Sequence, residues 1–338
     1  MMIPYRTARV LKRLGIVLLA VTLLILLVLS CWFLWLQRFV VYTRDGAQLD
    51  LSLSQQFVGG ETAVPPDPGD RVSIFYNEGD NAINISRELQ QIVGYYADKT
   101  ALETDIDLVL EQVRALPRDA AVMVDVKSPL GSFFYSSKIS EGRNPDVSTE
   151  KMDQLIRYLA EKNIYAIARL PALRDYAYGL DHVSDGIPVA GGYLWADEAY
   201  CYWLNPAREN VQKYLLEIIA ELKSLGFDEV VLDEFYIPYA DAIVYNSDRS
   251  EVLQQAANAL VEAATDSGFA VSFVDQGVIS LPEGKTRLYM TDVAAADVAK
   301  VAEESGITDP QLRMVFLTGV HDTRFDEYSV LRPLDAAH

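Results

Sequence analysis

The most constraining feature of this sequence is a regular alternation, from about residue 91 onward, of short apolar runs with segments of helical periodicity. The clearest helical segment spans 207–225, is preceded by Asn205 and Pro206 as capping residues, and ends before Gly226. Near-continuous apolar strands are typical of a parallel sheet that is covered by helices. Seven runs are predicted strands: 92–96, 121–126, 164–170, 229–235, 270–274, 287–291 and 313–318.

This pattern favours a closed barrel. Seven strands over roughly 240 residues approach the eight strands and ~250 residues of a (β/α)8 barrel. The weak 327–331 stretch could supply the eighth strand. A doubly wound open sheet is the alternative, although no G-x-G-x-x-G motif follows the first strand. We therefore predict an α/β fold of the TIM-barrel type over residues 91–338.

A long apolar segment precedes the predicted barrel. Residues 14–36 contain no charged side chain, and they match the ~20 residues that a helix needs to cross a bilayer. Four basic residues lie in the tail 1–13, whereas only Arg38 closely follows the segment. This asymmetry predicts a single-pass membrane anchor with a cytoplasmic N-terminus and an extracytoplasmic C-terminal domain.

The apolar segment also permits a cleaved leader or a lipid-modified cysteine. A cleaved signal peptide has a shorter apolar core of ~7–15 residues and a small-x-small cleavage site, whereas Trp-Phe-Leu-Trp follows Cys31 here. Lipid modification of Cys31 is the second alternative to an anchor. Residues 37–90 contain a predicted hairpin around Asp45-Gly46 and a Pro- and Gly-rich stretch, which together predict a spacer.

Charge and residue usage exclude several classes of function. Five of the 29 basic side chains precede residue 39 and all 48 acidic ones follow it, so the remainder carries a formal charge of −24. This argues against nucleic acid or an anionic lipid surface as the main partner of that part. Two cysteines and three histidines, without an H-E-x-x-H pair, argue against a zinc hydrolase. We predict neither a metal nor a cofactor.

Acidic residues gather at the ends of the predicted strands, where the chemistry of such barrels takes place. One such acid is commonly a turn former or a helix cap. Several carboxylates at one mouth would repel each other, and the repulsion would raise the pKa of at least one of them. One neutral acid beside one ionised carboxylate is what cleavage of a glycosidic bond requires. The acids are Asp125, Asp233, Glu234, Asp275 and Asp292, with Lys127 and Arg169 nearby.

The loop that follows the third predicted strand is rich in tyrosine and tryptophan. Flat rings with a polar edge suit stacking on a pyranose, so this loop predicts a carbohydrate ligand. A self-packed lid over the barrel accounts for the same residues equally well. The aromatic residues are Tyr176, Tyr178, Tyr193, Trp195, Tyr200, Tyr202 and Trp203.

Four segments carry a resemblance to a known family. They are Val124-Asp125-Val126-Lys127, 159–169, Trp203-Leu204-Asn205-Pro206 and 226–238. From about Gly94 to the last strand, the chain resembles the glycoside-hydrolase-like domain family, extracytoplasmic TIM barrels of largely uncharacterised activity. The family pattern at 226–238 is close to F-D-Y-x-R-F-P. Asp233 and Pro238 fit it, whereas Glu234 and Tyr236 replace its tyrosine and arginine, and Asn205 replaces a usual aspartate.

The resemblance implies a glycoside hydrolase that acts on a polysaccharide or cell-wall glycan. Similarity to amylase-like barrels suggests a nucleophile on the fourth strand and an acid on the fifth, here Asp233 and Asp275. Neighbours on an ideal strand point to opposite faces, and the family match favours Asp233 over Glu234. The alternative function is a catalytically inactive barrel that binds a glycan or an envelope protein. The catalytic candidates are Asp233, Asp275, Asp125 and Glu234, and the candidates for substrate binding are Lys127, Arg169, Trp195, Trp203, Tyr236 and Asp292.

Overall fold

The computed structural model describes residues 40–43, 46–49, 89–139, 146–266 and 268–334. The chain divides into two compact units, 1–63 and 64–338. In the first unit, β1 (Val40–Thr43) and β2 (Gly46–Leu49) pair in antiparallel orientation where a hairpin is predicted. Within the described ranges no helix is both long and apolar enough to cross a membrane. The predicted anchor at 14–36 lies outside them, as does most of the predicted spacer.

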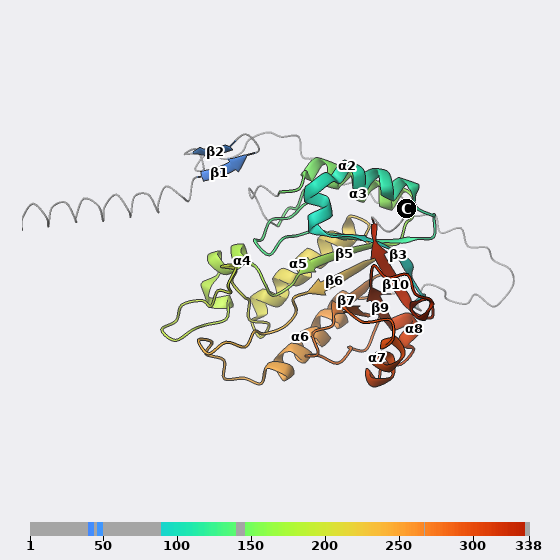
Figure 1. Ribbon diagram of the computed structural model, residues 1–338. Coiled ribbons are helices and arrows are strands. Elements are labelled where there is room, and N and C mark those ends of the chain that lie inside the picture. The colour runs from blue at the N-terminus through green and yellow to red at the C-terminus, as the bar shows by residue number, and fades with distance from the viewer. Residues whose placement is uncertain (1–39, 44–45, 50–88, 140–145, 267, 335–338) are drawn as a thin grey trace, which may run out of the picture. The chain divides into compact units, whose positions relative to one another are not determined.

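The second unit is a closed barrel of eight parallel strands, and the prediction of a TIM barrel is confirmed (Figure 1). Neighbouring strands follow each other in the sequence, and the last strand pairs with the first through Val330 opposite Val93. The eighth strand therefore exists, close to the weak stretch predicted for it, and the open-sheet alternative is wrong. The strands are β3 (Val93–Ala97), β4 (Ala121–Asp125), β5 (Ala166–Pro171), β6 (Glu229–Asp233), β7 (Ala270–Val274), β8 (Leu288–Thr291), β9 (Met314–Leu317) and β10 (Ser329–Pro333).

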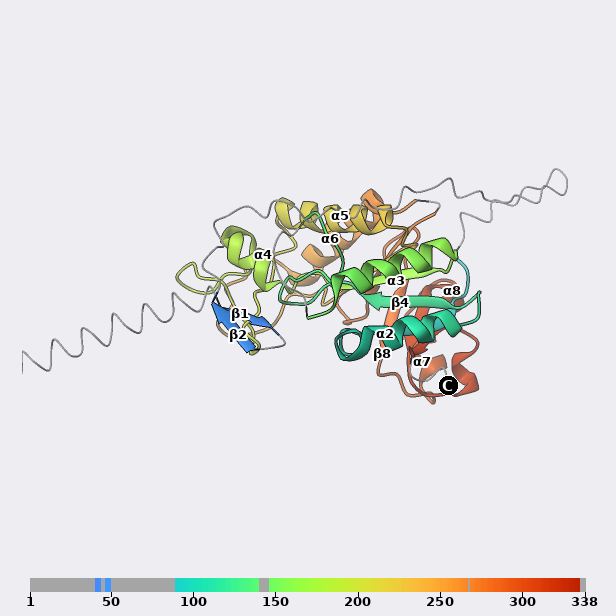
Figure 2. The same cartoon turned by 90° about the horizontal axis from the view of Figure 1, so that it is seen from above.

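Helices cover the outside of the strands (Figure 2). Each long helix turns one apolar face inward; α5, for example, buries Val211, Leu215, Ile218 and Leu222. This helix begins at Glu209, later than predicted, because Asn205 instead accepts the backbone N–H of Ala207 in the preceding turn. The helices are α2 (Lys99–Ala115), α3 (Thr149–Glu161), α4 (Tyr176–Asp181), α5 (Glu209–Ser224), α6 (Arg249–Ala264), α7 (Val298–Glu304) and α8 (Pro310–Arg313).

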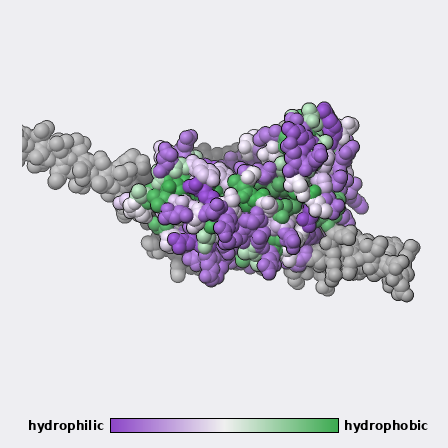
Figure 3. Space-filling view, turned by 90° about the horizontal axis from the view of Figure 1, so that it is seen from below, coloured by the Kyte–Doolittle hydropathy of each residue, from purple (hydrophilic) through white to green (hydrophobic). Residues whose placement is uncertain are grey.

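Two connections depart from the alternation of strand and helix, and one of them, between β9 and β10, contains only the 3-10 turn Thr323–Phe325. Residues 275–287, which join β7 to β8, contain no helix and run as an irregular segment. Residues of this loop and of α7 line a cavity against the outward-facing Leu288 and Met290 of β8. On the side of the molecule shown in Figure 3, most of the described surface is hydrophilic, as the many acidic residues require, and apolar side chains gather in a central band.

The strand side chains divide into two buried sets. Val122, Val124, Val230 and Leu232 belong to the large core that the strands share with the helices. The intervening strand positions form a second cluster. No helix contributes a fully buried residue to this cluster, so it fills the inside of the barrel. We refer to the members of this second cluster as the lumen residues: Ile92, Ala121, Met123, Ile167, Val231, Val274, Tyr289, Val315, Leu317 and Leu331.

A buried ion pair closes the lumen at the amino-terminal ends of the strands. Glu229, the first residue of β6, pairs with Arg287, and the two are 0% and 1% exposed. Tyr165 donates a hydrogen bond of 2.9 Å to the Glu229 carboxylate, and Ser272 donates another. Arg287 also donates to the Leu312 carbonyl oxygen at 3.0 Å and to that of Gln90 at 2.8 Å. The pair thus joins β6 to the segments that precede the first and seventh barrel strands.

This arrangement predicts a large loss of stability when one partner is removed. Glu229→Gln would leave the buried Arg287 cation without its counter-charge, so the free energy of unfolding should fall by about 3–5 kcal/mol. Urea unfolding of the variant and the wild type measures this difference. Glu209→Gln, which removes the exposed pair between Glu209 and Lys213, is the matched control and should change stability little. Equal losses in the two variants would contradict a structural role for the buried pair.

Candidate active site

Three charged side chains occupy the carboxyl-terminal end of the lumen, which we call the mouth. Asp125, Arg169 and Asp233 lie on the adjacent strands β4, β5 and β6, each two positions beyond a lumen residue. Asp125 and Arg169 are direct partners in the β4–β5 ladder. Because side chains alternate along a strand, all three turn into the mouth. Two predicted carboxylates and one predicted cation are therefore brought together.

Asp125 is fully engaged by hydrogen-bond donors. It accepts from Nε of Arg169 at 2.6 Å, from Nη2 of Arg169 at 3.1 Å and from the backbone N–H of Lys99 at 2.7 Å. Both carboxylate oxygens of Asp125 are therefore occupied by donors, and the bidentate guanidinium fixes their orientation. The geometry thus fits Asp125 as the residue that positions Arg169 better than it fits a proton-transferring acid.

Asp233 lies beside this pair in a different environment. Burial raises its pKa, and the charge of Asp125 adds to this effect, whereas Arg169 and the backbone N–H of Glu234 lower it. The N–H of Glu234 donates to Oδ1 of Asp233 at 2.7 Å. The net direction is a raised pKa, which means that part-buried Asp233 ionises less readily than a solvent-exposed aspartate.

Glu234 departs from strand geometry. Its φ is +50°, in the left-handed region that non-glycine residues rarely adopt, and β6 ends one residue earlier at Asp233. The expectation that strand alternation sends only one of this pair into the mouth therefore does not apply. Backbone strain of this kind is concentrated at functional sites. Among the predicted catalytic residues, Glu234 alone has a positive φ.

The carboxyl group of Glu234 is held on one side only. Nη1 of Arg174 donates to Oε1 at 2.9 Å, whereas Oε2 is buried and accepts no hydrogen bond from the described residues. Burial raises the pKa of Glu234, Arg174 opposes the increase, and the charge of Asp233 adds to it. The result is a raised pKa and one oxygen that is available to carry a proton.

Arg174 is fixed by a second acid in the loop after β5. Nε of Arg174 lies 2.6 Å from Oδ2 of Asp197. Asp197 also accepts from the indole N–H of Trp203 at 3.1 Å and from the backbone N–H of Cys201 at 3.0 Å. Burial raises the pKa of Asp197, but these hydrogen bonds and Arg174 together lower it. The sequence pattern does not reveal Arg174 or Asp197, because neither lies at a predicted strand end.

The aromatic residues of this loop divide by exposure. Trp203 is 3% exposed, and its ring centroid lies 4.6 Å from that of Tyr236 and 6.4 Å from that of Trp195. It is therefore part of a self-packed lid and does not offer a face to a ligand, contrary to the prediction for it. Trp195 and Tyr236 are half-buried on the same cluster. Tyr193 and Tyr200 are 76% and 80% exposed.

Lys127 does not reach the mouth. It is 2% exposed, and its Nζ lies 2.7 Å from Oδ2 of Asp175, which also accepts a hydrogen bond from the hydroxyl of Tyr214 at 2.8 Å. This buried group anchors the loops after β4 and β5 to helix α5. The position does not agree with the prediction that Lys127 contacts a substrate.

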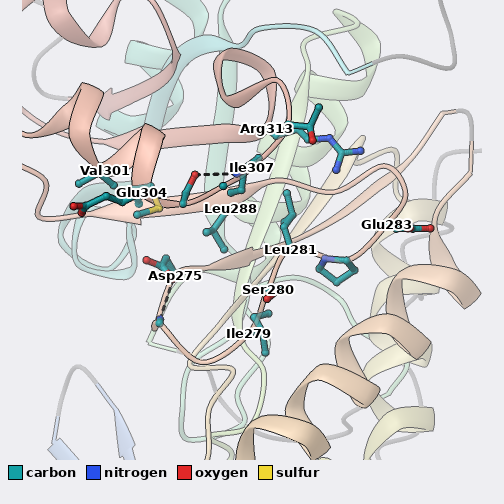
Figure 4. A pocket seen from close by; sticks show the side chains of 16 residues that line it. Asp275, Ile279, Ser280, Leu281, Glu283, Leu288, Val301, Glu304, Ile307 and Arg313 are labelled. Carbon is teal, nitrogen blue, oxygen red and sulfur yellow. Dashed lines mark hydrogen bonds between the residues drawn. The ribbon is translucent and has the colours of Figure 1, made fainter.

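Asp275 lies behind the barrel wall. The preceding residue, Val274, is a lumen residue, and the N–H of Asp275 continues the sheet by donating to the Tyr289 carbonyl oxygen at 2.8 Å. Alternation therefore turns Asp275 outward. Its carboxylate accepts the backbone N–H of Gly277 at 2.9 Å and lines a cavity of about 630 Å³ with the outward-facing Leu288 and Met290 (Figure 4). This is not the arrangement expected of a proton donor opposite Asp233.

Asp292, the last of the predicted acids, is exposed to solvent. It follows β8 with a φ of +58°. Within the described part of the chain, no group of three or more His, Cys, Asp or Glu side chains is arranged to hold a metal ion.

Comparison with known proteins defines the family. Residues 95–271 match the family described as "Putative glycosyl hydrolase domain". The chain belongs to this family. The match extends from β3 to the start of β7, so the matched segment includes Asp125, Asp233 and Glu234 but ends before Asp275.

Solved structures similar to this chain include several carbohydrate-active enzymes. The galactosidase domain of an alpha-galactosidase–sucrose kinase aligns with a TM-score of 0.51 and 13% identity over 73% of this chain and 38% of that one. A hypothetical protein from Ruminiclostridium thermocellum aligns with a TM-score of 0.44 and 23% identity over 55% of this chain and 99% of that one. An alpha-galactosidase from Thermus thermophilus aligns with a TM-score of 0.43 and 16% identity over 62% of this chain and 44% of that one. The first of these likenesses, at a TM-score of 0.51 and 13% identity, shows the barrel fold alone. The chain spans less than half of the two galactosidase structures. The comparison with curated proteins found no match.

The raised pKa of Asp233 predicts a specific dependence of stability on pH. Below the unfolded pKa of ~3.9 the group is protonated in both states and has no effect. As the pH rises toward and through the folded pKa, the unfolded state releases its proton more readily, so the wild type loses free energy of unfolding. Asp233→Asn abolishes this loss and should become more stable relative to the wild type as the pH is raised from acid to neutral.

Urea unfolding at a series of pH values measures the difference between the two proteins. Asp292→Asn removes one exposed carboxylate and serves as the control for net charge. A stability difference between Asp233→Asn and the wild type that stayed constant with pH, or that moved in favour of the wild type, would refute the raised pKa.

Proposed function

We propose that this domain cleaves glycosidic bonds, with Glu234 as the proton donor and Asp233 as the nucleophile or charge stabiliser. The observation that carries the proposal is the pair of adjacent carboxyl groups at the end of β6. The pKa of each is raised by burial, yet each has different neighbours. Two carboxyl groups in different surroundings can divide the acid and base roles between them.

The contacts indicate which group takes which role. Oε2 of Glu234 has no hydrogen-bond partner among the described residues, so it can hold a proton. Because this atom is buried, presenting the proton to a leaving-group oxygen requires the Glu234 side chain, or the side chains that cover it, to move when the substrate binds. Asp233 accepts a backbone N–H and lies close enough to Arg169 for the cation to oppose the rise in its pKa. These interactions support the anionic form, which a positively charged sugar transition state requires.

The substrate that fits these surroundings is an extended glycan. Tyr193 and Tyr200 project into solvent from the loop after β5, the loop that also supplies Arg174 and Asp197. Half-buried Trp195 and Tyr236 lie on the aromatic cluster beside the acids. Rings along a loop can stack on successive sugar units. A polysaccharide or cell-wall glycan is therefore proposed as the substrate.

The proposed location is the extracytoplasmic face of a membrane, with residues 14–36 as an uncleaved anchor. Support comes from the uncharged apolar run and from the basic tail that precedes it. A reporter enzyme that works only outside the cytoplasm should be active when it is fused after His338. The mature protein should also keep its N-terminal residues. N-terminal sequencing that began after Ser30 would replace the anchor by a cleaved leader.

A second candidate function is binding of a glycan without cleavage. Arg169 neutralises Asp125 through two hydrogen bonds, and Arg174 pairs with Glu234, so two of the predicted catalytic acids have cationic partners. Tyr236 and Asn205 also replace the residues that the family pattern carries there. In this alternative the charged side chains of the mouth hold the loops in place, and the aromatic rings provide the affinity.

Matched variants separate the two functions. Glu234→Gln and Asp233→Asn keep the side-chain shape but remove the proton donor or the negative charge, so each should slow cleavage at least ~100-fold. Asp275→Asn, on the outer side of the wall, should retain activity. Turnover is measured on fluorogenic glycosides and on isolated cell-wall polysaccharide, with circular dichroism as the check on folding.

The possible outcomes assign the residues. If Asp275→Asn lost activity and Glu234→Gln kept it, the proton donor would be Asp275, after the fifth barrel strand, and not Glu234. Full activity in both Asp233→Asn and Glu234→Gln would exclude the proposed pair. Glycan binding that is reduced by Trp195→Ala and Tyr193→Ala, without cleavage by the wild type, would establish the binding function instead.

A further inference from the structure

A second hollow lies at the opposite end of the barrel from the mouth. It has a volume of about 460 Å³ and lies between the carboxyl-terminal ends of α2 and α3, next to the segments that enter β4 and β5. Its apolar lining consists of Val113, Leu116 and Ile164. Three cationic side chains also line it: Arg114, Arg118 and Lys162.

The three cations come from three separate segments and converge on one place. Arg114 belongs to the last turn of α2, Arg118 to the loop before β4, and Lys162 is the C-cap of α3. Arg114 and Lys162 both lie over the ring of Tyr158, at 5.7 and 5.9 Å from its centroid. Cation–π contacts therefore hold two of the positive groups beside the hollow.

These cations lack acidic partners. None of the three forms an ion pair with a carboxylate of the described residues, whereas the lysines Lys151, Lys213 and Lys223 each pair with one. One acid, Glu161, lines the same hollow, so the cluster keeps an excess of positive charge. Acidic side chains outnumber basic ones by 48 to 29 in this protein, so a shortage of carboxylates does not explain why these three cations are unpaired among the described residues.

The helix termini explain only part of this arrangement. A cation near the carboxyl end of a helix is favoured by the helix dipole, which accounts for Arg114 and Lys162 individually. It does not account for Arg118, which lies outside any helix, or for the gathering of three exposed cations, whose mutual repulsion solvent weakens but does not remove. An anionic ligand in the hollow would relieve this repulsion.

We propose that the hollow binds a phosphate group through Arg114, Arg118 and Lys162. Arginine forks match the geometry of phosphate oxygens, and lysine adds a compact positive charge. The volume suits a small ligand, and the apolar lining suits a ligand that carries hydrocarbon next to its phosphate. Free phosphate and the headgroup of an anionic lipid share this chemistry. The proposal does not depend on glycan cleavage, because the mouth and the hollow lie at opposite ends of the strands.

Thermal unfolding of the full chain in a non-ionic detergent tests the proposal. Inorganic phosphate is titrated against sodium chloride at equal ionic strength, and a short-chain phosphatidylglycerol is titrated against the corresponding uncharged acylglycerol. A ligand that binds only the folded state raises Tm in a saturable way. The variant Arg114→Gln/Arg118→Gln/Lys162→Gln should bind at least ~10-fold more weakly. The control Lys213→Gln/Lys223→Gln/Lys300→Gln has the same change in charge on α5 and α7 and should respond like the wild type.

The two titrations distinguish the sources of the phosphate group. A saturable response to inorganic phosphate that is lost only in the first variant supports the site and identifies a free phosphate as sufficient. A response restricted to phosphatidylglycerol, with the same dependence on the variants, supports the site and identifies a lipid headgroup. The proposal is overturned if neither compound raises Tm, or if the two triple variants respond alike.

Discussion

Closure of eight parallel strands is the constraint on which the rest of this structure depends. Once β10 pairs with β3, every second strand residue must lie inside the barrel, and its height along the strand decides its neighbours. The base of the lumen holds the Glu229–Arg287 ion pair, the middle is apolar, and the mouth holds Asp125, Arg169 and Asp233. The height of a side chain along its strand thus separates the buried ion pair, which stabilises the fold, from the charged residues of the mouth, which can contact a ligand.

The fold could be predicted because its signals are local. Apolar runs and helical periodicity mark each strand and helix from its own residues, and even the weak eighth strand is found within two residues of β10. The direction of each side chain is a different matter. Parallel strands buried on both faces are apolar at every position, so the run 270–274 does not reveal that Val274 points inward and Asp275 outward.

The candidate site could be predicted only in part, because its decisive contacts join distant segments. Strand ends correctly indicated Asp125, Arg169 and Asp233 as neighbours, since register brings them together. The left-handed backbone at Glu234 and the bridge from Arg174 to Asp197 follow from loop conformations that have no periodic pattern. The same holds for Lys127, which follows a strand end that faces the mouth but is itself buried against Asp175.

The central claim is that Asp233 and Glu234 act together at the end of β6. It is tested most directly by a crystal structure of the full chain with a sulfur-linked, non-hydrolysable analogue of the glycan that it binds. We expect the bridging sulfur to lie about 3 Å from Oε2 of Glu234, within hydrogen-bond reach, with the adjacent sugar carbon facing Asp233. A ligand whose bridging atom lay remote from both carboxyl groups, or against Asp275 on the outer side of the barrel wall, would contradict it.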